Sequence, residues 1–332
     1  MYLQQRIALL VELGEYLISD NEEWNHIKRR AEQKNGWFIQ AFINKATQQI
    51  AENFLRKDLL ENWAAGYGIE EENTRPKTVG IVMAGNIPLV GFHDWLCVFI
   101  SGHKAVIKLS SKDDILLKHL VEWMSRQNEE VIQLTRFEEQ LKGCDAYIAT
   151  GSNNTSRYFE YYFGKFPNII RKNRTSVGLI RGNESEAELS ALADDVHLYF
   201  GRGCRNITKL YVPRNYDFVP MINAFAGYKY FFDHQKYRNN YDYNLALRML
   251  SKEFYMTSGS VIFSENPSLF TPVAQLHFEY YENLDLVKDF LNGNESVQCI
   301  AGREEMPFGT LQTPRLTDYA DGVDTLKFLQ SL

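Results

Sequence analysis

The sequence has few cysteines and no long hydrophobic run, and both shortages exclude classes of protein. Its 332 residues include four cysteines, which lie far apart and form no C-x-x-C pair. This spacing is typical of free thiols in a reducing compartment, and the seven histidines do not cluster with them at the spacing of zinc ligands. The longest strongly apolar run, WLCVFI, is six residues long and far too short to cross a membrane.

The sequence also lacks an excess of positive charge. A formal net charge of -6 and a pI near 5.7 argue against a general nucleic-acid-binding protein, which would carry a basic face. The first twenty residues, MYLQQRIALLVELGEYLISD, have helical spacing and carry acids, so they do not resemble a signal peptide. We therefore expect a cytoplasmic protein with no metal, no nucleic-acid partner and no membrane span.

The glycine motifs that commonly bind nucleotides are missing. There is no G-x-G-x-x-G and no G-x-x-x-x-G-K-[ST], and the chain has no internal repeats. The segment GRGCRN contains a G-x-G, but its third glycine is missing and it follows a helical pattern rather than a strand. A bound nucleotide would have to be held by other strand ends.

What is present is a regular alternation of predicted strands and helices after a helical start. Residues 1 to about 75 have helical spacing, and short apolar runs bounded by helical patterns follow. This alternation predicts a doubly wound parallel sheet. The strands expected in it are 78–85, 103–111, 144–152 and 175–182. Further strands are expected at 208–213, 258–265, 273–281 and 296–303.

Polar residues stand at three of these strand ends, where open parallel sheets bind ligands. The groups are Gly85 and Asn86, then Lys108 with Ser110 and Ser111, then Thr150, Gly151 and Ser152. Together they supply a cation, hydroxyls and a helix N-terminus, which suit a pyrophosphate and a ribose. Each has a plainer reading, because asparagine favours turns and a strand-end lysine is commonly solvated.

Cys204 lies in YFGRGCRNITKLYVP, between glycines and just before a predicted strand. It could be a small buried packing residue, a metal ligand or a nucleophile. His197, seven residues earlier, is an alternative catalytic partner. The aromatic segment 226–244 could line an acyl channel or form the core of a domain.

Several segments, in this order, resemble the aldehyde dehydrogenase superfamily. They are VMAGNIPLVGFHDWLCVFISGHKAVIKLSS, AYIATGSNN, YFGRGCRNITKLYVP, LFTPVAQLHFE and MPFG, and the resemblance covers roughly residues 75 to 315. The segments AGNIP, KNRTSVGLI and GCRN are similar to the LuxC-type branch, the fatty acyl-CoA reductases. The resemblance implies an α/β fold in which a Rossmann-type parallel-sheet cofactor domain is joined to a smaller α/β catalytic domain.

The resemblance also implies domain bounds and residue roles. It implies a helical segment at 1–75 packed on the cofactor domain, a nucleotide-binding domain at 76–182, a catalytic domain at 183–306 and a segment at 307–332 that returns to the cofactor domain. Cys204 is similar to the family's nucleophile and Asn86 to its oxyanion donor. The cofactor-binding residues implied are Met83, Ala84, Lys108, Ser110, Ser111, Thr150, Gly151, Ser152 and Phe270.

Three departures from the family pattern shape the expected function. The stretch IIRKNRT replaces the motif whose glutamate activates water, with Ile170 near that position. Ser111 stands where members that prefer NAD often carry a glutamate, and the chain is shorter than a typical member. Without a water-activating base the acyl-enzyme should resist hydrolysis. We therefore expect reduction of an acyl-CoA, or an acyl-carrier thioester, to the aldehyde with NADPH or NADH.

Alternatives to this function remain open at this stage. One is an acyl-phosphate reductase similar to glutamyl-phosphate reductase, which Arg202 and Arg205 would favour. The others are an aldehyde-oxidising dehydrogenase and a scaffold that has lost catalysis. Asp113 or Asp114 could turn inward and supply the missing ribose-binding acid. A homodimer is compatible with the pattern.

Overall fold

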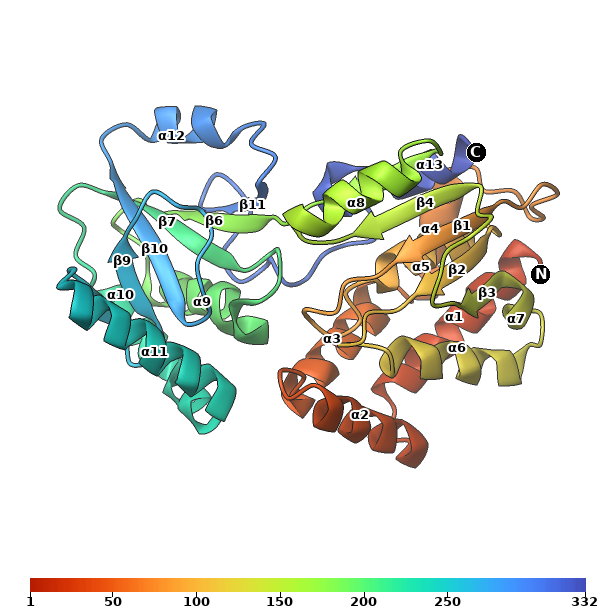
Figure 1. The fold of residues 1–332 in the computed structure, drawn as a ribbon, viewed down its shortest axis with the longest axis horizontal. Coiled ribbons are helices and arrows are strands. Elements are labelled where there is room, and N and C mark those ends of the chain that lie inside the picture. Colours follow the sequence, from red (N-terminus) through yellow and green to blue (C-terminus); the bar gives the residue numbers. More distant parts are fainter. The chain divides into compact units, whose positions relative to one another are not determined.

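The structure is a computed structural model that describes residues 1–332, and the chain divides into two compact units (Figure 1). The first unit contains Met1–Asn173 and Pro314–Leu332, and the second contains Arg174–Thr313. The second unit is therefore inserted into the sequence of the first. None of the helices is long and apolar enough to cross a membrane.

The first unit is built on a five-stranded sheet in which every pairing is parallel. Its order is β3-β2-β1-β4-β5, the strand order of a dinucleotide-binding sheet. The strands are β1 (Thr78–Val82), β2 (Lys104–Lys108), β3 (Thr135–Phe137), β4 (Ala146–Thr150) and β5 (Asn168–Arg171). The order reverses between β1 and β4, and at such a point ligands bind outside the carboxyl ends of the strands.

Helices surround this sheet, and the most apolar of them, α5 (Phe92–Ile100), is buried along almost its whole length. Its sequence, FHDWLCVFI, has no polar face, as expected for a core helix. The other helices of the unit are α1 (Leu3–Ile18), α2 (Glu22–Lys34), α3 (Gln40–Asn53), α4 (Lys57–Gly66), α6 (Leu116–Gln127), α7 (Val131–Leu134), α8 (Asn153–Phe163), η3 (Ala320–Gly322) and α13 (Thr325–Gln330). The helical start expected from the sequence is confirmed by α1 to α4.

Residues 314–332 are held to the first unit by buried polar contacts. Arg171, the last residue of β5, forms an ion pair with Asp94 of α5 and donates a hydrogen bond to Thr325 Oγ1 at 3.0 Å. The Trp63 indole N–H donates to the Tyr319 hydroxyl at 2.9 Å. Because a buried ion pair is costly to break from one side, these contacts fix α13 in the core.

The second unit has a six-stranded sheet in the order β11-β6-β7-β10-β9-β8. All of its pairings are parallel except that of β8 with β9. The strands are β6 (Thr175–Leu179), β7 (Ile207–Pro213), β8 (Met256–Thr257), β9 (Ile262–Glu265), β10 (Gln275–Tyr281) and β11 (Val297–Ala301). The helices are α9 (Glu186–His197), η1 (Leu198–Gly201), α10 (Val219–Phe225), η2 (Ala226–Asp233), α11 (Gln235–Ser251) and α12 (Leu284–Leu291).

One strand pairs differently from the expectation. The strand predicted at 175–182 is present as β6, but it pairs with β7 and β11 of the second sheet rather than with the strands before it. The position beside β4 that was expected for this strand is occupied by β5. The reason is that the chain leaves the first unit after Asn173, between β5 and β6, which are only a few residues apart.

Candidate active site

The three strand ends singled out in the sequence meet at one edge of the first sheet. Val82, the last residue of β1, is in register with Lys108 of β2 on one side and with Ala149 of β4 on the other. The segments that follow these strands therefore start side by side. The expected juxtaposition of the three polar groups is a consequence of this parallel register.

The loop after β1 is tightly held against the loop after β2. The Met83 N–H donates to the Lys108 carbonyl at 3.0 Å, which extends the β1–β2 ladder by one bond. A Cβ atom at Gly85 would lie 2.7 Å from Ser110 Oγ, so only glycine fits there. Asn86, half-buried, follows at once. Its backbone position is thus set by the close packing of the two loops.

The turn that carries Asn86 ends in a strained residue. Leu89 has a φ of 55°, in the left-handed region that non-glycine residues rarely occupy. Its N–H donates to Asp113 Oδ2 at 2.8 Å, while Asp113 Oδ1 is buried without a hydrogen-bond partner. Asp113 has therefore turned inward, as the sequence allowed, but it binds the Asn86–Leu89 turn.

Burial raises the pKa of Asp113 to about 7, although the Leu89 N–H opposes the shift. In the unfolded chain the carboxyl ionises near pH 3.9, so between roughly pH 4 and pH 7 only the folded state keeps the proton. The contribution of this group to stability is therefore greatest below pH 4 and falls as the pH rises to about 7.

Asp113→Asn is expected to raise the thermal unfolding midpoint relative to the parent protein, and by more at pH 8 than at pH 4, because the variant loses no stability across that window. The neighbouring change Asp114→Asn, which removes a half-buried carboxylate paired with Lys34, serves as the control. The midpoints of all three proteins across this pH range decide the question. A difference between Asp113→Asn and the parent that is independent of pH would contradict the assignment.

The end of β2 presents charge and hydroxyls to solvent. Lys108 and Ser111 are exposed, and Ser110 is half-buried against Gly85. Asp114, the second acid of the alternative reading, forms an ion pair with Lys34 Nζ at 2.5 Å. Both candidate ribose-binding acids are thus engaged with other groups of the first unit.

The end of β4 leads directly into the N-terminus of α8. Ser152 is the N-cap residue, and its Oγ accepts a hydrogen bond from Thr155 N–H at 3.3 Å. Gly151 N–H donates to the Arg171 carbonyl at 3.2 Å, and a Cβ at Gly151 would lie 2.8 Å from the Phe159 ring. This packing places the positive end of the α8 dipole beside the sheet edge, where it favours an anion.

In the second unit, Cys204 lies in a turn between η1 and β7. It is partly exposed, whereas the other three cysteines, Cys97, Cys144 and Cys299, are buried. Burial raises the pKa of both the Cys97 and the Cys144 thiols, which makes them poor nucleophiles. No group of three or more His, Cys, Asp or Glu side chains is placed to hold a metal ion. Exposure thus singles out Cys204 as the candidate nucleophile.

The chain enters the Cys204 turn through three successive left-handed residues. Tyr199, Phe200 and Gly201 have φ values of 55°, 57° and 69°. Left-handed conformations of non-glycine residues cost roughly 1–3 kcal/mol each and cluster at functional sites. The turn is then closed by Asn206, whose N–H donates to the Gly203 carbonyl at 3.1 Å. The Cys204 carbonyl accepts a hydrogen bond from Ser176 Oγ at 3.1 Å.

His197 is a structural residue in this unit. Its ring is 1% exposed, Nδ1 donates to the Ala193 carbonyl at 2.8 Å, and Nε2 bonds Ser260 Oγ at 2.9 Å. Burial lowers the pKa of His197 to about 4, so the ring is neutral at physiological pH. With both nitrogens engaged inside the unit, His197 is unsuited to act as a catalytic partner for a thiol.

The loop that carries Phe270 is anchored by side chains that no local sequence pattern indicates. Thr208 and Lys209 of β7 and His277 of β10 bond three carbonyls of this loop. Thr208 Oγ1 donates to Leu269 O at 2.5 Å, Lys209 Nζ to Asn266 O, and His277 Nδ1 to Ser268 O at 2.9 Å. Lys209 also forms an ion pair with Glu279 Oε2 at 2.9 Å. Phe270, half-buried, is therefore held from two neighbouring strands.

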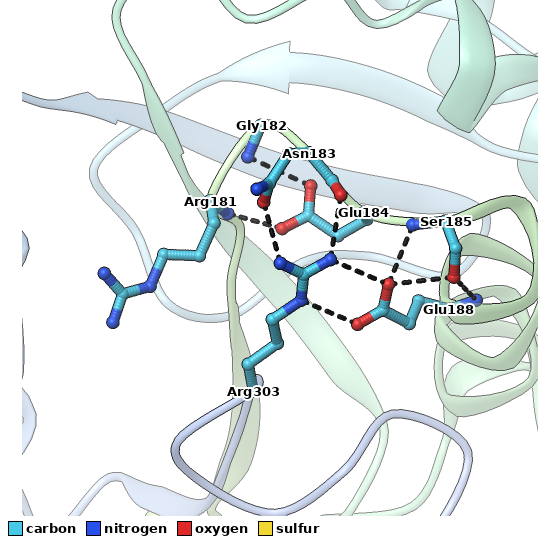
Figure 2. A network of polar contacts seen from close by, with 7 residues as sticks. All are labelled: Arg181, Gly182, Asn183, Glu184, Ser185, Glu188 and Arg303. Carbon is cyan, nitrogen blue, oxygen red and sulfur yellow. Dashed lines mark hydrogen bonds and ion pairs between the residues drawn. The ribbon is translucent and has the colours of Figure 1, made fainter.

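A second network anchors the segment that leads to the MPFG loop (Figure 2). Arg303 donates to both carboxylate oxygens of Glu188, at 2.8 and 3.0 Å, and to the side chain and carbonyl of Asn183. Glu188 completes a capping box with Ser185 at the start of α9. The same helix holds the far side of the loop, because Asp195 Oδ2 accepts from Gly309 N–H at 2.6 Å. Helix α9 thus fixes both ends of residues 303–309.

The aromatic segment 226–244 forms η2 and the start of α11. Phe231, Tyr237 and Tyr241 are buried, and the ring of Phe231 packs edge-on against that of Phe200 at 4.8 Å between centroids. Tyr237 also lines a small recess beside Gly201 and Pro272. Phe231, Tyr237 and Tyr241 therefore belong to the core of the unit, whereas Tyr230 and Tyr243 of the same segment are exposed.

No protein-family model and no curated protein matches this sequence. Three similar solved structures are an indole-3-acetaldehyde dehydrogenase of P. syringae in complex with NAD+ and IAA, an NAD-dependent aldehyde dehydrogenase from Sinorhizobium meliloti, and an NADP dependent enzyme of E. coli. Their TM-scores are 0.66, 0.67 and 0.68, and their identities are 11%, 12% and 11%.

Each match covers most of this chain and most of the chain to which it is compared. They cover 91%, 94% and 91% of this chain and 72%, 73% and 73% of the other chains, in the same order. The expected α/β architecture, with its Rossmann-type parallel sheet, is confirmed. The chain has the fold of the aldehyde dehydrogenases.

Proposed function

We propose that this protein is an oxidoreductase that reduces an acyl thioester, such as an acyl-CoA, to the aldehyde with NADPH or NADH. The observation that carries the proposal is the turn of residues 203–206, which leaves Cys204 partly exposed while the other cysteines are buried. The fold supports it, because two of the similar structures are described as aldehyde dehydrogenases and one as NADP dependent. The LuxC-type branch is favoured by the segments AGNIP, KNRTSVGLI and GCRN.

The residues at the edge of the first sheet fit a dinucleotide. Gly85 lets the loop after β1 pack against Ser110, Lys108 and Ser111 are exposed where a ribose would be held, and the α8 N-terminus after Ser152 favours a pyrophosphate. Met83, Ala84, Ser110, Thr150 and Gly151 belong to the same loops. We assign Phe270 of the second unit to the nicotinamide ribose.

In the proposed reaction the Cys204 thiolate attacks the acyl carbonyl, the carbon–sulfur bond to the carrier breaks, and the carrier leaves as a thiolate that takes a proton from water. The Asn86 amide and the Cys204 N–H donate to the oxyanion that forms on the carbonyl oxygen. The product of this step is a thioester on Cys204. When bound, the nicotinamide cofactor would supply the hydride that reduces this thioester to the aldehyde and releases Cys204 as the thiolate.

The absence of a water-activating carboxylate sets the proposed direction. Ile170, near the position of the family's glutamate, lies in β5 and has no group that could accept a proton. The next residue, Arg171, is engaged with Asp94 and Thr325. The thioester is therefore proposed to resist hydrolysis, so that reduction or return to a thiol is favoured over oxidation of an aldehyde to the acid.

A second candidate is the reduction of an acyl phosphate, because Arg202 and Arg205 flank Cys204. Arg205 Nη1 is directed to Cys299 Sγ, at 3.5 Å, and burial lowers the pKa of Arg202. The discriminating test incubates the protein with NADPH and panels of acyl-CoAs and acyl phosphates while nicotinamide absorbance is followed. Faster loss with acyl-CoAs is expected, whereas turnover of acyl phosphates alone would establish the second candidate, and no turnover would favour a scaffold.

The same assay, run with both cofactors, is expected to show that NADPH is accepted and preferred over NADH. Ser111 does not repel a 2′-phosphate, Lys108 offers it a positive charge, and Asp114 is engaged with Lys34. Comparing kcat/KM for the two cofactors in the parent and in Ser111→Glu tests this, since the added acid should favour NADH. A clear NADH preference in the parent would mean that an acid already binds the ribose.

A further inference from the structure

The side chain of Asn206 uses every hydrogen-bonding group it has to hold the turn that carries Cys204. It is fully buried, with an exposed fraction of 0%. Its Oδ1 accepts from the Gly203 N–H at 2.8 Å, and its Nδ2 donates to the carbonyls of Asp195 and Leu198, both at 2.9 Å. One side chain therefore links the nucleophile turn to the last turn of α9.

The backbone of Asn206 adds bonds on the opposite side. Its carbonyl accepts from the Ser176 N–H of β6 at 3.1 Å and from Thr175 Oγ1 at 3.3 Å. Ser176 Oγ in turn donates to the Cys204 carbonyl. The turn is thus held between α9 and β6, although the residues that precede it are left-handed and strained.

The required chemistry is specific to a primary amide of this length. The site needs one acceptor facing the Gly203 N–H and two donors facing carbonyls. Aspartate would supply the acceptor but would place a carboxylate against two carbonyl oxygens in the protein interior, which is unfavourable. Alanine would leave one buried N–H and two buried carbonyls without this partner.

We propose that Asn206 is a positioning residue that holds Cys204, and with it the Cys204 N–H, in the orientation that the reaction needs. The inference rests on the proposed function of Cys204, and it assigns to Asn206 an effect on turnover beyond its effect on stability. A nucleophile displaced by about 1 Å can lose roughly 100-fold in rate. Substrate affinity, which depends on other contacts, should change little.

The test compares Asn206→Ala with Val212→Ala. Val212 is buried near the far end of β7, the strand that Asn206 precedes, so its truncation destabilises the second unit without touching the turn. At a temperature where both variants are folded, Asn206→Ala is expected to lower kcat about 100-fold with KM within about threefold of the parent, while Val212→Ala retains its kcat. Equal losses in both variants, or an unchanged kcat in Asn206→Ala, would overturn the proposal.

Two further measurements keep the proposal decidable. If Asn206→Ala does not fold, Ser176→Ala takes its place, because it removes one hydrogen bond to the same turn. We expect kcat of this variant to fall about fivefold or more, and an unchanged kcat would overturn the inference. The rate at which iodoacetamide alkylates Cys204 in the folded protein can be measured without any substrate. The alkylation rate is expected to change at least about fivefold in Asn206→Ala, or in Ser176→Ala if Asn206→Ala does not fold, and to stay the same in Val212→Ala. This result would support positioning even if the parent forms no acyl adduct and the proposed function fails.

Discussion

Cys204→Ala is expected to remove all detectable reductase activity while leaving the fold and cofactor binding intact. The thiol is the group that forms the covalent bond to the acyl carbon in the proposed reaction, and no other side chain of the turn can replace it. The side chain is small and partly exposed, so its truncation leaves no large cavity. Steady-state turnover with acyl-CoA, together with cofactor binding measured by fluorescence, provides the test.

The covalent intermediate gives an independent measure of the same residue. Mass spectrometry of the parent protein with acyl-CoA, in the absence of reduced cofactor, should show an acyl adduct on Cys204. Cys144→Ala is the matched control, because Cys144 is buried in the first unit and its change should leave both adduct and turnover as they are. An adduct on one of the buried cysteines instead would mean that the nucleophile has been misassigned.

Asn86→Ala is expected to lower kcat by roughly two to three orders of magnitude, equivalent to about 3–4 kcal/mol of barrier, as observed when one oxyanion donor is removed. KM should change little, because the bond strengthens only as negative charge develops on the oxygen. The unfolding midpoint is measured in parallel, since Asn86 also follows the tightly packed Gly85.

Asn86→Asp separates the catalytic role from the turn-forming one. Aspartate has the same size and the same preference for turns, but its carboxylate cannot donate a hydrogen bond. If Asn86 serves only to form the turn, the aspartate variant should retain near-normal turnover. If the amide donates to the oxyanion, the aspartate variant should be at least as slow as the alanine variant.

The edge of the first sheet could be predicted from the sequence because every clue to it is local. Each strand there is a short apolar run that ends in small or polar residues, and parallel strands bring such ends together without further information. The sheet to which β6 belongs could not be predicted, since its pattern is that of any buried strand. The short edge strands β3 and β5 carry polar residues in their sequences, TRF and NIIR, and were not recognised as strands.

In the candidate site, the sequence indicated Cys204 but not the residues that hold it. Asn206 stands two residues further on, where an asparagine before a strand is usually a turn residue. Lys209 lies in an apolar strand, and its partner Glu279 is 70 residues away, so nothing local indicates that the lysine is buried and paired. Contacts of this kind depend on which strands become neighbours, which single-sequence patterns do not specify.

The ion pair between Arg171 and Asp94, with Thr325 as a third member, has a consequence for the order in which the chain matures. The second unit, residues 174–313, contains every strand of its own sheet, whereas the first unit needs α13 from beyond the insertion to complete its core. Until Thr325 arrives, the guanidinium and carboxylate of the first unit are only partly enclosed. When the denatured chain refolds, the inserted unit should therefore be the earlier of the two to acquire protection from proteases, and the unit that comes first in the sequence should be the last to close.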